Sequence, residues 1–90
     1  MLNLTWELNA GCYIAEWRDG SNDWAILSVQ PRMRGTKNQP ERAWQWMMQG
    51  NAAGVSFEAG SPRVDAETTI EQAQERAETF LACLFPHSND

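Results

Sequence analysis

The stretch LNLTWELNAGCYIAEWRDGSNDWAILSV, residues Leu2–Val29, decides the fold. Its first part, Leu2–Leu8, alternates apolar and polar residues with a period of two, which is typical of a half-buried strand. Candidate turns follow at Asn9–Gly11 and at Asp19–Asn22, where glycine and small polar residues gather. The stretch therefore predicts three antiparallel strands joined as a meander.

The lengths of the two turns set the predicted register of these strands. A three-residue turn at Asn9–Gly11 places Trp6 opposite Ile14, and a four-residue turn at Asp19–Asn22 places Ile14 opposite Leu27. One face then forms the predicted core, with Trp6, Leu8, Cys12, Ile14, Leu27 and Val29. The opposite face collects Thr5, Glu7, Tyr13, Ala15, Trp17, Trp24, Ile26 and Ser28. This second face is too aromatic for an ordinary solvated surface.

Downstream of this stretch, the sequence predicts a loop and then a helix. Pro31 is expected to end the third strand, and residues 32–39 read as a loop. Pro40 suits a first helical position, and Trp44, Met47 and Met48 have the i, i+3, i+4 spacing of a helix that ends near Gln49. Trp46 points about 200° away from Trp44 on that helical wheel, so one of the two tryptophans is expected to be exposed.

The last part of the chain predicts a short strand and a second helix. Val55–Phe57 lies between glycines and reads as a fourth strand candidate. Thr68–Glu71 fits a capping box, and an apolar stripe with helical spacing follows it: Ile70, Ala73, Ala77, Phe80, Leu81 and Leu84. We therefore expect an α+β fold, in which two helices pack on one face of a three-stranded antiparallel meander. Residues 1–85 form a single domain, and 86–90 form a disordered tail.

The composition argues against several classes of function. The 90 residues have 42% apolar content and a net charge of −5, and they contain no membrane span or signal sequence, so we expect a cytoplasmic protein. Cys12 and Cys83 lie far apart in no metal-ligand spacing, and two buried free thiols are favoured over a disulfide. His87 is the lone histidine and falls in the predicted tail. No cofactor, metal or catalytic residue is predicted, and the chain is expected not to be an enzyme.

Surplus aromatic and acidic residues predict a surface that binds a protein partner. Tryptophan is enriched at recognition surfaces, and Trp17 and Trp24 fall on the non-core face of the predicted sheet. Glu71, Glu75 and Glu78 follow i, i+4, i+7 spacing on the outer side of the last helix, where a plain solvated face is the alternative. The predicted partner-binding residues are Tyr13, Trp17, Asp19, Asp23, Trp24, Glu67, Glu71, Glu75 and Glu78. The partner is another protein or a second copy of the chain.

A basic segment gives the alternative hypothesis of a nucleic-acid-binding module. Arg32, Arg34 and Lys37 flank Gly35 in the predicted loop, where they would contact phosphates while Trp17 and Trp24 stack on bases. The segment lacks the glycine spacing of a phosphate-binding loop, and the overall acidity disfavours nucleic acid.

In size, acidity, aromatic content and predicted order of elements, the chain resembles small phage-encoded accessory proteins, including the anti-CRISPR group. In that group, acidic α+β domains of about 10 kDa bind an effector complex and block its positively charged DNA channel. The resemblance implies a non-enzymatic inhibitor that binds and blocks a larger host complex such as a CRISPR effector. It rests on general architecture and on no motif, so it assigns no residue a role.

Overall fold

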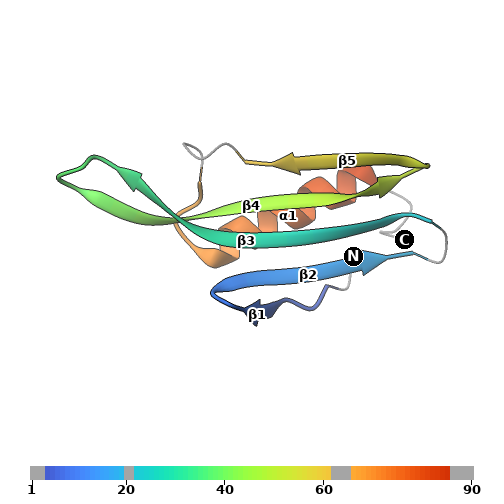
Figure 1. Ribbon diagram of the computed structural model, residues 1–90, viewed down its shortest axis with the longest axis horizontal. Coiled ribbons are helices and arrows are strands. Elements are labelled where there is room, and N and C mark those ends of the chain that lie inside the picture. The colour runs from blue at the N-terminus through green and yellow to red at the C-terminus, as the bar shows by residue number, and fades with distance from the viewer. Residues whose placement is uncertain (1–3, 20–21, 62–65, 86–90) are drawn as a thin grey trace.

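The computed structural model describes residues 4–19, 22–61 and 66–85. Within them, five antiparallel strands form one sheet in chain order, and a helix covers one of its faces (Figure 1). The elements are β1 (Glu7–Asn9), β2 (Cys12–Arg18), β3 (Trp24–Gly35), β4 (Pro40–Ala52), β5 (Val55–Gly60) and α1 (Ile70–Leu84). The prediction of three strands and two helices was therefore wrong. The tail predicted at 86–90 lies outside the described residues.

The helix predicted at Pro40–Gln49 is strand β4, which lies between β3 and β5 in the sheet. Residues of this segment also alternate with a period of two, because Trp44, Trp46 and Met48 fall on every second position. In a strand these three side chains share one face, whereas on a helix the two tryptophans would point apart. β4 pairs with β3 from Trp24↔Asn51 to Gly35↔Pro40, and this long pairing overrides the helical spacing.

Strand β3 does not end at Pro31, as the sequence predicted. Its pairing with β2 ends near Val29, so beyond that point β3 is bonded to β4 alone. Proline is tolerated in a strand that has a neighbour on one side only, because its missing N–H then breaks no ladder. The outer part of the β3–β4 hairpin, residues 32–43, projects beyond the rest of the sheet (Figure 1). We call these residues the arm.

Both predicted hairpin registers are wrong by one residue, and turn length explains each error. The β1–β2 turn is the two-residue type with positive φ at Ala10 and Gly11, so Glu7 rather than Trp6 lies opposite Ile14. Between β2 and β3, Arg18 pairs with Trp24, which makes the connection five residues long instead of four. The two shifts move the odd-numbered residues of β2 onto the core face.

The β4–β5 turn repeats the two-residue type, with φ of 53° at Ala53 and 83° at Gly54. Alanine in this left-handed region costs about 1–2 kcal/mol, whereas Asn-Gly is the preferred pair for such a turn. We expect Ala53→Asn to raise the free energy of unfolding by about 1 kcal/mol, measured by urea titration. Ala10→Asn is the matched variant in the β1–β2 turn. It should raise the free energy of unfolding by less, because β1 has only three residues and contributes less to the sheet. A lower midpoint for Ala53→Asn would contradict the turn assignment.

The core lies between α1 and the sheet face that α1 covers, which we call the helix face. One row across this face is Trp17–Ala25–Gly50–Phe57, with large side chains at its ends and small residues in its middle. Phe85 packs against both ends of this row: its ring centroid lies 4.4 Å from that of Trp17 and 6.3 Å from that of Phe57. From α1, Ala73, Ala77 and Leu81 are fully buried against the sheet.

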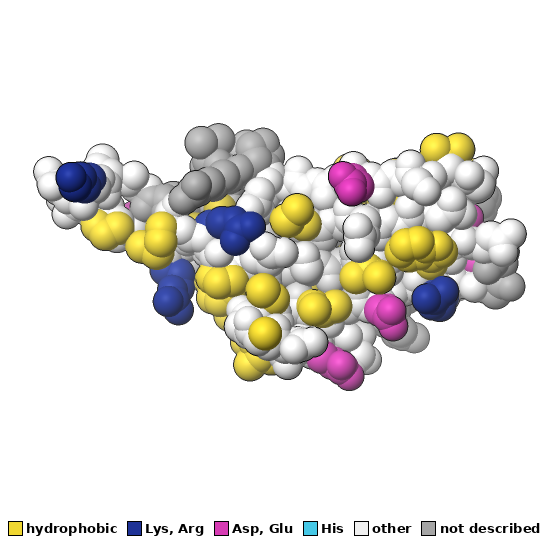
Figure 2. Space-filling model, in the orientation of Figure 1, with side chains coloured by type: hydrophobic (Ala, Val, Ile, Leu, Met, Phe, Trp, Pro, Cys, Tyr) yellow, Lys and Arg dark blue, Asp and Glu magenta, His cyan; other side chains and the backbone are white. Residues whose placement is uncertain are grey.

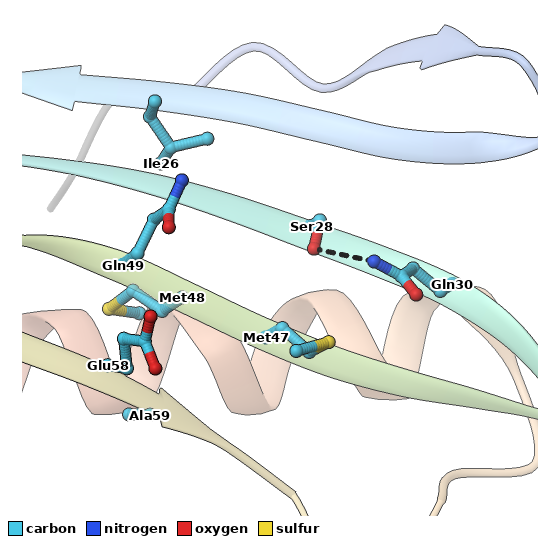
Figure 3. Close-up of a pocket in the computed structure, with 8 residues that line it drawn as sticks. All are labelled: Ile26, Ser28, Gln30, Met47, Met48, Gln49, Glu58 and Ala59. Carbon is cyan, nitrogen blue, oxygen red and sulfur yellow. Dashed lines mark hydrogen bonds between the residues drawn. The ribbon is translucent and has the colours of Figure 1, made fainter.

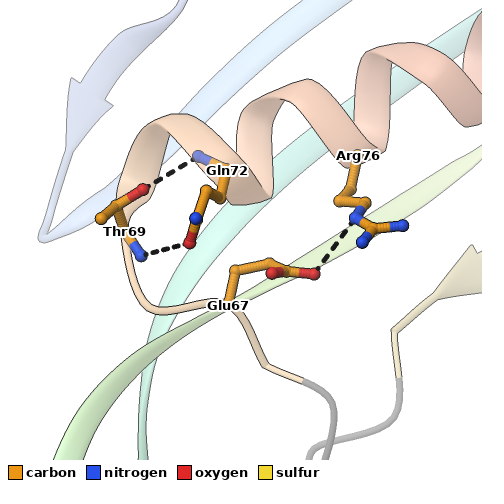
Figure 4. Close-up of polar contacts among 4 residues, drawn as sticks. All are labelled: Glu67, Thr69, Gln72 and Arg76. Carbon is orange, nitrogen blue, oxygen red and sulfur yellow. Dashed lines mark hydrogen bonds and ion pairs between the residues drawn. The ribbon is translucent and has the colours of Figure 1, made fainter.

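Helix α1 confirms the prediction for the last element, apart from its first residue. The N-cap is Thr69 rather than Thr68: its side chain accepts a hydrogen bond from the Gln72 backbone N–H, and the Gln72 side chain accepts one from the Thr69 N–H (Figure 4). The segment before the helix is held to the sheet by two backbone hydrogen bonds between Glu67 and Trp44. Leu84, predicted to be in the core, is exposed, and Phe85 is buried instead.

Candidate functional site

The sheet face opposite α1 has no element covering it among the described residues, and we call it the open face. The register places three apolar side chains near its centre on three neighbouring strands, Ile14, Ile26 and Met47. Ser28 lies between Ile14 and Met47 in one row, and Gln49 lies beside Ile26 in the next. The centre of the open face therefore combines apolar side chains with uncharged polar ones.

Hydrophobic side chains extend across much of this face, and basic side chains lie mainly toward the arm, with another near the opposite end (Figure 2). Met47 is 40% exposed, and Ile14 and Ile26 are half-buried. The nearest acidic residues of the sheet are Glu7, which lies directly opposite Ile14, and Glu16 and Glu58, which stand at the two ends of the row that contains Ile26 and Gln49. Charged groups thus border an uncharged centre, which is the composition of a protein interface.

A shallow depression of about 250 Å³ lies at this centre (Figure 3). Ile26, Met47, Gln49 and Glu58 come to it from three adjacent strands. Ser28 and Gln30 lie along its β3 side, where the Gln30 amide is 3.4 Å from the Ser28 hydroxyl. Amide and hydroxyl groups of this kind can donate or accept hydrogen bonds, so the depression suits a partner with exposed polar groups around an apolar side chain.

Trp24 extends the open face at the end farthest from the arm. It is half-buried, and a second depression beside it is lined by Gln49, Ser56 and Glu58, among other residues. Its row on the open face is Arg18–Trp24–Asn51–Ser56. A partly exposed tryptophan at the edge of an apolar surface is a typical anchor for a partner.

The predicted pairing of Trp17 with Trp24 on one exposed face was wrong. Trp17 lies on the helix face and is 8% exposed, because the one-residue shift in register turns it toward α1. Tyr13 lies on the same face, half-buried, with its ring edge-on to that of Trp44 at 6.2 Å. Trp24 and Ile26 are on the non-core face as predicted, but Ile14, predicted in the core, joins them there.

The predicted acidic residues occupy two places, neither at the centre of the open face. Asp19 and Asp23 lie at the β2–β3 connection, where the Asp23 carboxylate accepts a hydrogen bond of 2.9 Å from the Ala53 N–H of the β4–β5 turn. Glu71 and Glu75 are exposed on α1, on the other side of the sheet from the open face, and Glu78 is half-buried there. Glu67 forms an ion pair of 3.3 Å with Arg76 (Figure 4).

The predicted nucleic-acid contacts Arg32, Arg34 and Lys37 all lie on the arm. Trp24 begins β3 whereas the arm contains its end, so tryptophan and basic residues are separated by most of the strand. The Arg32 guanidinium is held by three acceptors: Gln30 Oε1 at 2.7 Å, Gln45 Oε1 at 3.0 Å and the Pro31 carbonyl at 3.0 Å. The structure therefore does not bring Trp17 or Trp24, the predicted stacking residues, next to the basic residues.

Both cysteines are free thiols, and they are not buried as predicted. Cys12 is half-buried at the start of β2, and Cys83 is exposed near the end of α1. In the described part of the chain, no three histidine, cysteine or acidic side chains lie close enough together to hold a metal ion.

The sequence reasoning missed Ile14 and Met47 as surface residues. Ile14 was placed in the core by the assumed turn lengths, and Met47 was placed on the apolar stripe of the assumed helix. Gly11 is the signal that could have found Ile14, because a two-residue turn that ends in this glycine moves Ile14 to the other face. For Met47 the signal is the period-two spacing of Trp44, Trp46 and Met48, which in a strand puts Met47 on the opposite face.

Within the described residues, α1 is too short and too polar to cross a membrane. Comparison of the chain with protein-family models, with curated proteins and with solved structures found no match.

Proposed function

We propose that this protein is a non-enzymatic binding domain that contacts a protein partner through the open face. The observation that carries the proposal is the uncharged centre of that face, formed by Ile14, Ile26 and Met47 with Ser28 and Gln49. Depletion of charge around apolar and aromatic anchors is the compositional feature of interface cores. Trp24 supplies the aromatic anchor at one end.

We propose that the protein is cytoplasmic. Both described cysteines are free, and one of them is exposed. Thiols in that state are typical of a reducing compartment, since disulfides persist mainly in oxidising ones.

Site-specific photocrosslinking in the cells that carry this chain tests the proposal. A photoreactive amino acid at position 47 samples the centre of the open face, and the same residue at position 75 samples the far side of α1 as the matched control. We expect one protein other than the chain itself to be crosslinked repeatedly from position 47 and from position 24, and not from position 75. Crosslinks to another protein from position 75 alone, or none from the open face, would contradict the proposal.

For the partner so identified, we expect Met47→Glu to weaken binding at least about 30-fold, equivalent to ~2 kcal/mol, because it puts a charge into the apolar centre. Met47 is 40% exposed, so the free energy of unfolding should change by no more than about 0.5 kcal/mol. Calorimetric titration of the purified partner measures the first effect, and a urea titration measures the second. Met47→Leu is the control and should bind like the wild type. Equal affinity of Met47→Glu and wild type would rule out this surface.

We propose that the partner is a larger host complex that the chain blocks, such as a CRISPR effector. The acidity of the chain outside the arm supports this, because the DNA channel of such an effector is positively charged. Target-DNA cleavage by a purified effector, with and without the chain, tests it. Uninhibited cleavage would remove this effector as the partner and leave the binding surface to the crosslinking experiment.

A further inference from the structure

The arm carries a charge opposite to that of the rest of the chain. It contains Arg32, Arg34, Lys37 and Arg42 against the single acidic residue Glu41, a net charge of +3. The other three basic and eleven acidic residues of the chain give the remainder a net charge of −8. Lys37 and Arg42 are exposed, and the arm projects from the end of a molecule that measures 49 × 22 × 22 Å. Because the arm is basic and projects from the molecule, we expect it to bind an acidic surface.

The anionic surface of this chain begins where the arm joins the rest of the sheet, at the pair Pro31↔Trp44, which we call the root. Trp44 lies opposite Pro31 where the arm starts, and its backbone is bonded to Glu67, three residues before α1. From there, Glu71, Glu75 and Glu78 follow along α1, which runs away from the arm behind the sheet (Figure 1). A hollow of about 340 Å³ lies between Glu67 and the helix residues Gln72, Glu75, Arg76 and Thr79.

The two charged features have similar lengths. From the root to the last pair of the arm, Gly35↔Pro40, strand β3 advances four residues. At the usual rise of a strand, this part of the arm is about 13 Å long. From Glu71 to Glu78 the helix rises about 10 Å. Because the arm and the acidic stretch leave the same root in opposite directions, a two-fold axis at the root would lay each arm along the other copy's α1.

We propose that two copies of this chain associate in this way, with the arm of each copy on the acidic surface of α1 in the other. A second copy is favoured over nucleic acid as the occupant, because a polyanion would attract the arm and repel the body that carries −8. The dimer leaves both open faces uncovered, so it is compatible with partner binding through the open face. The proposed dimer also differs from self-association through the face that carries Trp24 and Ile26, because that contact would bury the open face.

A charge-swap experiment tests the dimer. The arm variant carries Lys37→Glu with Arg42→Glu, and the helix variant carries Glu71→Lys with Glu75→Lys. Sedimentation velocity should show the wild type approaching twice 10.2 kDa as its concentration rises, with an affinity that falls as salt is added. Each variant alone should dimerise at least about tenfold more weakly, because like charges then face each other at both contacts.

Mixing the two variants provides the decisive measurement. In the mixed dimer, the acidic arm of one copy meets the basic helix of the other, and the second contact is the unaltered pair. We expect the mixture to recover dimerisation to within a few-fold of the wild type, which an unfolded chain could not do. If a reversed variant failed to fold, Lys37→Gln with Arg42→Gln and Glu71→Gln with Glu75→Gln would each be expected to weaken the dimer and its salt dependence.

Three results would overturn the inference. The first is a wild type that stays monomeric at every concentration. The second is a dimer that neither reversal weakens, which would place the contact elsewhere, including on the open face. The third is a monomer that shifts a duplex oligonucleotide only when Lys37 and Arg42 are present, which would make nucleic acid the partner of the arm. The first and third results do not bear on crosslinking from position 47, whereas a dimer through the open face would appear there as a crosslink to a second copy.

Discussion

Trp17→Ala is expected to unfold this protein at temperatures where the wild type is folded. Trp17 is 8% exposed and packs against Phe85 with 4.4 Å between ring centroids, so its removal leaves a cavity beneath the end of α1. Truncating a buried tryptophan costs about 3–5 kcal/mol, which is most of the stability of a small domain. Thermal unfolding followed by circular dichroism measures the effect.

Trp24→Ala is the matched control for this prediction, since it removes the same side chain from the open face. Because Trp24 is half-buried and away from α1, we expect a loss of about 1 kcal/mol or less. Phe85→Ala should behave like Trp17→Ala, and in the double mutant the two losses should fail to add by about 0.5–1.5 kcal/mol. If Trp17→Ala and Trp24→Ala melted together, the register of β2 and β3 would be wrong.

Gly50→Ala is expected to destabilise the protein by about 1–3 kcal/mol or more, the usual range for overpacking a core. A Cβ at this position would overlap the Trp24 carbonyl oxygen, and it would lie 2.9 Å from the Ala25 Cα and 3.0 Å from Phe57 Cε1. Two of these three neighbours are backbone atoms in the middle of the sheet, so they can move only by separating the strands. Urea titration measures the loss.

Gly54→Ala separates crowding from backbone conformation. Gly54 has a φ of 83° but nothing within 4 Å of the added Cβ, so its cost is conformational alone, about 1–2 kcal/mol. Gly54→Asn should recover most of that cost, because asparagine tolerates the left-handed region. A Gly50→Asn variant should recover none of the stability that Gly50→Ala loses, because crowding causes that loss. Recovery at position 50 would show that the neighbours of Gly50 give way easily.

The sequence predicted strand β2, the first part of β3 and the last helix correctly, but it placed the wrong face of β2 in the core. Period-two alternation locates a strand, but which face is buried depends on the strand partner, and a turn one residue shorter exchanges the faces. Ala10 and Ala53 hide the turn type, since alanine rarely adopts positive φ and gives no signal for it. Trp17 was therefore predicted at the surface and Ile14 in the core, the reverse of the structure.

Strand β4 was missed for a different reason. Trp44, Met47 and Met48 fit a helix, whereas Trp44, Trp46 and Met48 fit a strand, and local spacing does not choose between them. Pairing with β3 decides, and that contact joins residues up to 27 positions apart, from Trp24 to Asn51. The incompatible directions of Trp44 and Trp46 on a helical wheel were the local sign of a strand. For the candidate site, the sequence placed Trp24 and Ile26 on the correct face. It did not predict Met47 there, because it assigned the residues of β4 to a helix.

The position of α1 after all the strands has a consequence for how the chain matures on the ribosome. The sheet is a meander whose hairpins close between neighbours, so it can assemble as each strand emerges. The helix that covers Leu27 and Val29 is synthesised after the whole sheet, and Phe85 can contact Trp17 only when 68 further residues have been added after Trp17. During that interval the nascent sheet presents apolar side chains on both faces, which is when chaperones bind or chains aggregate. The speed at which residues 70–85 are translated thus sets how long each new molecule is vulnerable.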